Sequence, residues 1–271
     1  MQTLKRVIKG SLVGLYALVT VFPFLWALSI SIKPKELATR YPPVFDFHPT
    51  FLAYQELFTK YHFGTYLINS LVLAILVLVI SLFLGALAGY SFARFRVGGK
   101  SLAFGVLVIQ MIPPMVITFP LFLTIRAFGL LDTIPGLALA QLSYSLPFVM
   151  WVMRSFFLQV PVELEESAKL DGASNFRIFF SIIVPVSVPG LVSAGIFTFL
   201  GSWNDLLLPL ILSNMHAQTI TVASSNFVTV YDILWTDVDA SALLMIVPPV
   251  ILILFARKYI VAGLLGSSIK G

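Results

Sequence analysis

The chain has no cysteine and little charge. Only 11% of its 271 residues are charged, whereas 59% are hydrophobic, and the mean hydropathy is +0.98; soluble domains are about 25% charged. The missing cysteine excludes a disulfide framework, a thiolate metal site and a Cys-x-x-Cys redox motif. The composition therefore indicates a polytopic membrane protein. The net charge of +5 follows the predicted membrane topology and is not a nucleic-acid footprint.

Catalytic and metal-binding motifs are also missing from the sequence. There is no H-E-x-x-H, no Gly-x-Ser-x-Gly and no glycine-rich phosphate loop. The three histidines, His48, His62 and His216, fall in predicted outer loops without metal-ligand spacing. We therefore expect neither an enzyme nor a chain that holds its own metal or cofactor. Uphill transport by such a chain needs energy from another subunit.

Long apolar runs dominate what is present. Backbone groups in lipid must bond internally, so spans are helices or closed barrels, and these runs show none of the alternation of a barrel strand. A helical span needs about 20 apolar residues. Six runs qualify, at residues 8–32, 64–92, 102–125, 134–153, 186–212 and 240–255. We predict an all-α bundle of six transmembrane helices in a single domain over residues 1–271.

The first run has an alternative interpretation as a cleaved signal peptide, with Lys5, Arg6 and Lys9 as its basic region. The apolar stretch is longer than a signal peptide needs, and no convincing small-x-small cleavage site ends it. We therefore favour a retained helix.

Proline and glycine mark special points within the spans. Pro113, Pro114 and Pro120 interrupt the third span, and prolines of this kind predict kinks because each removes a backbone hydrogen bond. Gly85 and Gly89 form a Gly-x-x-x-Gly pattern in the second span. That pattern permits close helix packing, although it is common by chance.

Lys and Arg are distributed unevenly between the two sides of the predicted bundle. Of the seventeen, five fall on one side: Lys33, Lys35, Arg40, Lys60 and Arg126. Twelve fall on the other: Lys5, Arg6, Lys9, Arg94, Arg96, Lys100, Arg154, Lys169, Arg177, Arg257, Lys258 and Lys270. Because basic loops stay cytoplasmic, we expect both termini and residues 161–189 in the cytoplasm.

The stretch from Pro161 to Pro189 carries acidic charge in an otherwise apolar chain. Pro161 suits a first helical position. The positive end of the helix dipole stabilises glutamates in the first turn. Gly172 can end that helix in a left-handed conformation, and Ser174 or Asn175 can cap the next. In that second helix one apolar face is predicted to hold Phe176, Phe179, Phe180 and Ile183. The pair suggests a docking knob, although an ordinary solvated loop helix has the same pattern.

Neutral polar and aromatic side chains lie within the predicted spans. Amides and hydroxyls bond polyols, and aromatic faces pack on the apolar face of a sugar ring, so such residues suit an uncharged polar solute. The alternative is that they only bond neighbouring helices. The candidate substrate pathway comprises Asn69, Gln110, Gln141, Tyr144, Trp203, Asn204 and Asp205.

Asp205 is the only ionisable residue near the middle of a predicted span. Ionisable groups inside a membrane are costly and mark proton or ion pathways in many transporters. An ion-coupled secondary carrier that uses Asp205 therefore stays open as an alternative.

The acidic stretch resembles a known signature. Glu166-Ser167-Ala168, three residues, Gly172, nine residues and Ile182-Ile183-Val184-Pro185 resemble the E-A-A–x3–G–x9–I-x-L-P motif, with Ser167 and Val184 as departures. That motif marks membrane subunits of bacterial binding-protein-dependent ABC importers. The resemblance implies that loop 161–185 is a coupling helix which docks on an ATP-binding subunit. The implied contact residues are Glu163, Glu165, Glu166, Ser167, Ala168, Asp171, Gly172 and Ala173.

Further pieces are similar to the shorter, maltose-type second permease of carbohydrate importers. They are Pro42-Pro43, Asn69-Ser70, Tyr90–Arg94, Gly129–Thr133, Trp203-Asn204-Asp205 and the tail Gly263…Ile269-Lys270-Gly271. The resemblance implies a type I ABC importer permease fold and import of a sugar, oligosaccharide or glycosylated polyol by alternating access. An ABC permease for a non-sugar solute is the alternative within the superfamily.

The resemblance also implies an assembly in the bacterial inner membrane. It implies a second homologous permease, two cytoplasmic ATP-binding subunits that hold ATP and Mg, and an extracytoplasmic solute-binding protein. On this basis the chain itself binds no cofactor and is driven from the cytoplasm through the acidic stretch.

Overall fold

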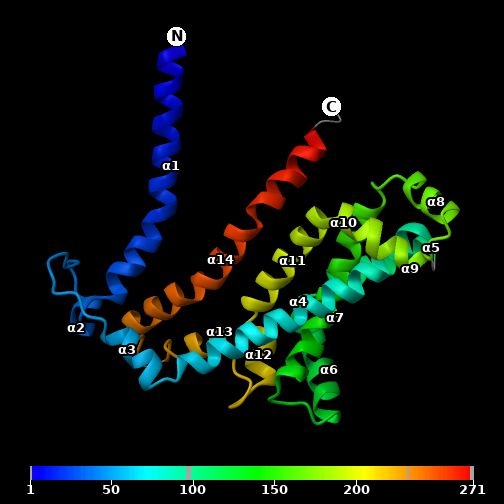
Figure 1. Cartoon of the computed structure of the whole chain (residues 1–271). Helices are drawn as coiled ribbons and strands as arrows, with labels where there is room; N and C mark the ends of the chain where they lie inside the picture. The colour runs from blue at the N-terminus through cyan, green and yellow to red at the C-terminus, as the bar shows by residue number, and fades with distance from the viewer. Residues whose placement is uncertain (1, 96–98, 231, 269–271) are drawn as a thin grey trace. The chain divides into compact units, whose positions relative to one another are not determined.

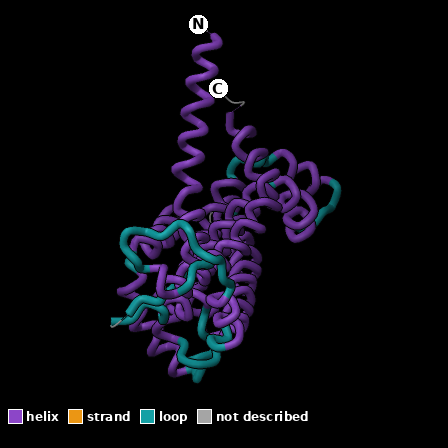
Figure 2. The backbone as a smooth tube through the Cα atoms, turned by 90° about the vertical axis from the view of Figure 1, so that its left-hand side faces the viewer, coloured by secondary structure: helices purple, strands orange, loops and turns teal. Residues whose placement is uncertain are grey.

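A computed structural model of the chain describes residues 2–95, 99–230 and 232–268. These residues form helices joined by loops and no strand, apart from an isolated bridge between Val228 and Ile233 (Figure 2). The predicted all-α class is confirmed. Arg96 and the tail Ile269-Lys270-Gly271, used in the sequence predictions, lie outside the described residues.

Fifteen helical elements follow one another along the described chain (Figure 1). The first seven are α1 (Gln2–Ser31), α2 (Lys35–Ala38), α3 (Leu52–Thr59), α4 (Phe63–Arg94), α5 (Gly99–Met111), α6 (Pro114–Ala127) and α7 (Ile134–Phe157). The next four are α8 (Glu163–Leu170), α9 (Asn175–Ile178), the π-helix η1 (Phe179–Ile183) and α10 (Val184–Val186). The last four are α11 (Val188–Trp203), α12 (Leu207–Leu212), α13 (Ile220–Ser225) and α14 (Trp235–Ser268).

Four helical stretches are long and apolar enough to cross a membrane: Lys9–Ser31, Phe63–Arg94, Ile134–Phe157 and Trp235–Lys258. Two bent helix pairs pass the same test together. The described residues thus offer four spans, or six when each bent pair counts as one. Five predicted spans overlap these segments closely, whereas the fifth, 186–212, shares mainly Val188–Trp203 with its bent pair, Asn175–Val186 and Val188–Trp203, which meet at 78°.

The third predicted span bends by 96° between α5 and α6. Pro113 has the extended backbone of a helix cap (φ −56°, ψ 133°), and Pro114 opens α6. A proline lacks the N–H of a helix interior, and it pushes the preceding residue out of the helical region. The predicted kink is therefore a full break.

The fifth predicted span, 186–212, is also not continuous. Helix α11 ends at Trp203, and α12 starts anew at Leu207. Asp205 stands in the gap, where its Oδ1 accepts from the backbone N–H of Leu207 at 3.1 Å and of Leu208 at 3.4 Å. A side chain that caps a new helix in this way ends the previous one, which apolar periodicity alone did not reveal.

The chain divides into two compact units. The first comprises residues 1–65 and 223–248. Lys35 of this unit forms ion pairs with Glu56 and, at 3.4 Å, with the fully buried carboxylate of Asp237. Lys33 lies 5.7 Å from the ring centre of Trp26 and 5.1 Å from that of Phe47. The single domain expected over residues 1–271 stays a prediction.

The second unit comprises residues 66–222 and 249–271 and is built around α7. Helix α4 comes unusually close to it. A Cβ added at Gly85 would lie 2.8 Å from Val149 Cβ, and one at Gly89 would lie 2.8 Å from Met150 O. The Gly-x-x-x-Gly pattern thus marks a real helix contact, where only glycine leaves room for the α7 backbone.

Candidate functional site

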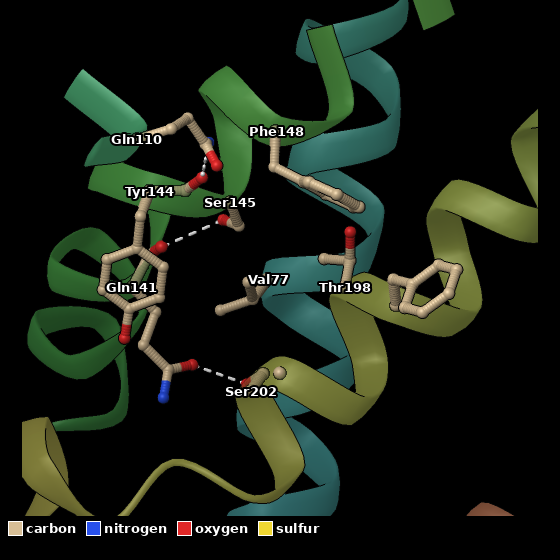
Figure 3. A pocket seen from close by; sticks show the side chains of 10 residues that line it. Val77, Gln110, Gln141, Tyr144, Ser145, Phe148, Thr198 and Ser202 are labelled. Atoms are coloured by element: carbon tan, nitrogen blue, oxygen red, sulfur yellow. Dashed lines mark hydrogen bonds between the residues drawn. The ribbon is translucent and has the colours of Figure 1, made fainter. Parts of the chain in front are cut away.

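A cavity of about 280 Å³ opens inside the second unit, between α4, α5, α7 and α11 (Figure 3). A volume of this order suits one small ring or part of a larger ligand. It is lined by Val77, Gln110, Gln141, Tyr144, Ser145, Phe148, Phe197, Thr198, Gly201 and Ser202. None of these described lining residues carries a charge.

Gln141 is the centre of the polar network beside this cavity. Its side chain is fully buried; Oε1 accepts from Ser202 Oγ at 2.5 Å, and Nε2 donates to Asp205 Oδ2 at 2.8 Å. Tyr144 donates its hydroxyl to the same Oδ2 at 2.9 Å. A buried amide bonded at both ends has a fixed orientation, so Gln141 and Tyr144 are held in place from behind the cavity.

Asp205 therefore supports the cavity from outside its lining. Two side-chain donors bond its Oδ2, and the two backbone N–H groups that start α12 bond its Oδ1. A polar group that is partly buried among helices is stable when it is hydrogen-bonded. The arrangement accounts for a carboxylate in an apolar helix bundle without a coupling ion.

The other predicted pathway residues have different surroundings. Gln110 lines the cavity but donates Nε2 to Tyr144 O at 2.9 Å. Trp203 is 1% exposed and stacks on Phe199. Asn204 donates to Leu200 O, and Asn69 donates to the carbonyls of His216 and Gln218. Within the Trp-Asn-Asp cluster, Asp205 bonds Gln141 and Tyr144, which both line the cavity.

The predicted pathway contained three of the ten residues that line the cavity, Gln110, Gln141 and Tyr144. Thr198 and Ser202 are four residues apart in α11, and Gln141 and Ser145 are four apart in α7. Residues at this spacing share one helix face. A search for polar pairs at i and i+4 within the spans would have found Thr198 with Ser202, and would have added Ser145 to the predicted Gln141.

The acidic stretch forms α8 as a short helix followed by a turn at Gly172. Gly172 has φ +78°, and its N–H bonds Lys169 O at 3.0 Å, which is the predicted left-handed helix end. Ser174 then accepts from Arg177 N–H as the cap of α9. Both sequence predictions are confirmed.

The residues expected to contact the ATP-binding subunit are partly exposed and partly turned toward the rest of the chain. Those exposed to solvent are Glu163, Glu166, Ser167, Asp171 and Gly172. Ala168 and Ala173 are half-buried against an apolar cluster that includes Phe157, Phe179 and Ile183. Leu170, which sequence reasoning did not single out, is 90% exposed. The exposed surface of residues 162–172 thus combines acidic side chains with Lys169 and with the apolar side chains of Val162, Leu164 and Leu170.

Glu165 points into the protein. It is 2% exposed; Oε1 accepts from Arg94 Nε at 2.5 Å and Oε2 from the Tyr90 hydroxyl at 2.7 Å. Arg94 also donates Nη2 to Val160 O at 2.8 Å. Both carboxylate oxygens are therefore bound within the chain.

The single apolar face predicted for Phe176, Phe179, Phe180 and Ile183 is wrong. Phe179 and Ile183 are buried, but Phe176 is 71% and Phe180 is 47% exposed. Residues Phe179–Ile183 form a π-helix, whose extra residue per turn shifts the register of an α-helical pattern. The spacing therefore distributes these rings over two faces.

A second carboxylate, the partly exposed Asp132, joins two loops of the second unit. Asp132 accepts from the backbone N–H groups of Asn214 at 2.8 Å and Ala217 at 3.0 Å, and from those of Met215 and His216 between them. Burial alone would raise the pKa of Asp132, but these four donors hold it near 2. The carboxylate is a fixed anchor for residues 214–217.

The sequence of the chain matches a known protein family. A profile of the family described as "Binding-protein-dependent transport system inner membrane component" matches residues 81–265. The trehalose transport system permease protein SugB of Mycobacterium tuberculosis (strain CDC 1551 / Oshkosh) is 37% identical over 255 residues, 93% of each chain. The trehalose/maltose transport system permease protein MalG of Thermococcus litoralis is 31% identical and covers 100% of this chain and 99% of its own.

Solved structures share the fold. One is the crystal structure of a bacterial ABC transporter involved in the import of the acidic polysaccharide alginate, with TM-score 0.77 and 21% identity over 95% of this chain and 97% of that one. Another is the MetNI methionine ABC transporter in an inward-facing conformation, with TM-score 0.59 and 16% identity. The match covers 74% of this chain and 93% of that one. The predicted type I importer permease fold is confirmed. The chain belongs to the family of binding-protein-dependent transport system inner membrane components, the permease subunits of ABC importers.

Proposed function

We propose that this permease subunit imports a neutral sugar, oligosaccharide or glycosylated polyol, and that the solute passes through the cavity beside Gln141. The observation that carries the proposal is the chemistry of that cavity. Its described lining combines two amides, several hydroxyls and three aromatic rings without a charge. Relatives named for trehalose, maltose and diacetylchitobiose transport support the same class.

The cavity chemistry discriminates between solutes. Amide and hydroxyl groups can each exchange hydrogen bonds with sugar hydroxyls, and the rings of Phe148 and Phe197 suit the apolar face of a pyranose. An amino acid or phosphate would bring charge into a site without a charged lining partner, and burying an unpaired charge is costly. The cavity therefore favours a sugar over a charged solute.

The energy for transport is proposed to come from two cytoplasmic ATPase subunits that bind ATP and Mg. The docking surface is the exposed part of the acidic stretch, which includes Glu163, Glu166, Asp171 and Leu170. Closure of the ATPase dimer would move α8 and rock the spans between inward- and outward-facing states. A second homologous permease and an extracytoplasmic solute-binding protein complete the proposed assembly in the bacterial inner membrane.

The orientation is proposed from the distribution of basic residues, which places both termini and α8 in the cytoplasm. It can be tested independently of transport because the chain has no cysteine. Single cysteines at Lys169 and at Met215 are expected to react with an impermeant maleimide from opposite sides of the membrane. Reaction of both from the same side would overturn the topology.

The function is tested by uptake into proteoliposomes that contain the complete assembly. ATP is enclosed in the lumen, on the side that the ATPase subunits face. We expect accumulation of radiolabelled trehalose or maltose that unlabelled disaccharide abolishes and that amino acids, peptides and phosphate leave unchanged. Competition by an amino acid and none by disaccharides would overturn the sugar assignment. Accumulation by this chain alone without nucleotide would overturn the ATP-driven mechanism.

A further inference from the structure

We propose that Glu165, Arg94 and Tyr90 form a positioning clamp that makes the acidic helix α8 move as one body with α4. The inference rests on the proposed function of α8 as the docking segment, and adds how its movement reaches the solute cavity. Glu165 is a positioning residue here and makes no contact with the ATPase subunits.

The geometry of the clamp is unusually complete for three side chains near a protein surface. Tyr90 is 5% and Glu165 2% exposed, and the guanidinium of Arg94 bonds both the Glu165 carboxylate and Val160 O. Val160 lies in the linker between α7 and α8. One arginine thus joins α4, this linker and α8.

Helix α8 needs such an external support. It has eight residues, and isolated helices shorter than about 12 residues are marginal in water. Its other inward contacts are the small side chains Ala168 and, just beyond it, Ala173. The remaining faces carry exposed residues, so the position of α8 depends on the hydrogen bonds of Glu165.

The clamp is attached to the helix that leads to the cavity. Tyr90 and Arg94 belong to α4, which also carries Val77 in the cavity wall. Seventeen residues separate Val77 from Arg94, or about 25 Å along a continuous helix. Aromatic rings pack around Tyr90 at this end of α4. Its ring centre lies 5.9 Å from that of Phe157 and 5.1 Å from that of Phe179. A displacement of α8 is therefore delivered to α4.

The chemistry requires these side chains in particular. The planar guanidinium reaches two acceptors at a fixed angle, which the single ammonium of lysine cannot reproduce. A glutamine at 165 keeps the shape but loses the charge, and it can accept through only one oxygen. Removal of one partner of a buried pair leaves the other uncompensated, so each substitution loosens the same joint.

The test uses the complete assembly in nanodiscs and proteoliposomes, with Glu165→Gln, Arg94→Lys and Tyr90→Phe. We expect each variant to assemble and to retain basal ATP hydrolysis. The number of ATP molecules hydrolysed per trehalose imported should rise at least tenfold in Glu165→Gln and less in Tyr90→Phe. The double variant Glu165→Gln with Arg94→Lys should be no worse than either single variant, because both substitutions loosen the same contact between α4 and α8.

A distance measurement separates positioning from a general loss of structure. Spin labels on cysteines at Lys169 of α8 and Leu84 of α4, both exposed, should give a narrow distance distribution that Glu165→Gln broadens. Asp132→Asn, which breaks hydrogen bonds elsewhere in the same unit, should leave both the distribution and the ATP ratio unchanged. An unchanged distribution in Glu165→Gln with a normal ATP ratio would overturn the clamp.

The clamp and the proposed substrate can fail separately. Stimulation of ATP hydrolysis by the solute-binding protein needs no knowledge of the solute, and in Glu165→Gln we expect that stimulation to fall toward the basal rate. If wild type imports another solute class and the variant still shows this loss, the sugar assignment fails and the clamp stands. If the variant is stimulated normally, the clamp fails whatever the solute.

Discussion

Glu165 and Arg94 form an ion pair, with 2.5 Å between Oε1 and Nε, in a place where both side chains are almost fully buried. They come from segments 71 residues apart in the sequence. Their neighbour Glu166 is exposed, so adjacent glutamates in one acidic helix have opposite surroundings. One is part of the internal framework, and the other is available to a partner.

The exposed acidic residues of α8 should be required to couple ATP hydrolysis to solute uptake. Glu166→Lys reverses one charge at the docking surface and is expected to abolish uptake while the chain still inserts in the membrane. Binding of the ATPase subunit to the permease, measured by co-purification at increasing salt, should weaken more than tenfold. The matched control is Gln159→Lys, an exposed position ahead of α8, and an equal loss there would argue against a specific docking surface.

Gly172 should tolerate no side chain, for a reason that concerns the backbone alone. Its φ is +78°, and a Cβ added there meets nothing within 4 Å, so the cost of Gly172→Ala is the left-handed strain of about 1–2 kcal/mol. Gly129 has φ +68° and equally open space, which makes Gly129→Ala a control of equal strain outside α8. We expect both variants to melt slightly earlier, and only the first to lose coupled uptake. Equal uptake in the two would contradict a special role for the turn after α8.

The contact of α4 with α7 should be sensitive to a single methyl group. Gly89→Ala places Cβ 2.8 Å from Met150 O and 3.0 Å from Arg154 N, both backbone atoms, so the helices must separate. Overpacking of this kind costs about 1–3 kcal/mol, and we expect a lower melting temperature in detergent. Gly105→Ala, where nothing lies within 4 Å, should be neutral or slightly stabilising. A stable Gly89→Ala would mean that the two helices can move apart freely.

The polar network of the cavity should govern solute affinity. Gln141→Leu removes the acceptor of Ser202 and one donor of Asp205. Unpaired buried polar groups cost about 1–3 kcal/mol each, so we expect uptake at low solute concentration to fall at least tenfold. Ser155→Ala, on an exposed face of α7 with only a local bond to Trp151 O, is the matched control. Normal uptake by Gln141→Leu would place the solute path elsewhere.

Asp205 distinguishes the ATP-driven mechanism from an ion-coupled carrier. Asp205→Asn keeps one acceptor oxygen, but its amide nitrogen cannot accept the hydrogen bonds from Gln141 and Tyr144, so we expect reduced uptake that remains dependent on ATP. Collapse of the membrane potential and proton gradient should leave wild-type uptake unchanged. Uptake that stops with the gradients and persists without ATP would favour the carrier.

Asp132 should make stability depend on pH in the acid range. Its pKa is held near 2 in the folded chain, below the ordinary value of about 3.9. A lowered folded pKa stabilises the fold fully above about pH 4, and the contribution is lost as the pH falls toward 2. Asp132→Asn should unfold at a lower temperature at pH 7, and between pH 5 and 2 its melting temperature should fall less than that of wild type. Parallel profiles would show that the four backbone donors do not stabilise the charged form.

Most of the fold follows from local properties of the chain. The runs of apolar residues predict the spans because a helix of about 20 residues in lipid must be apolar. Gly172 and Ser174 mark the ends of short helices through their own backbone and side-chain preferences. The breaks at Pro113 and at Asp205 were harder to predict, since a proline in a span can kink a helix or end it, and a capping carboxylate looks like a buried charge.

The candidate site depends more on long-range contacts. Gln141 and Ser202 are 61 residues apart, so their hydrogen bond is invisible to any local pattern. The π-helix at Phe179–Ile183 also escaped prediction, because its register shift depends on how the rings pack against α4 and α7.

The amino-acid sequence by itself determined that this chain is a helical membrane protein with one acidic segment, because apolar length and turn chemistry are local properties. Only the tertiary structure decided which polar groups face the cavity and which hold it from behind. It also decided that Glu165 points inward to Arg94 while Glu166 faces out. The physical reason is that a buried charge or amide is stable only beside its partners, and those partners come from distant parts of the chain.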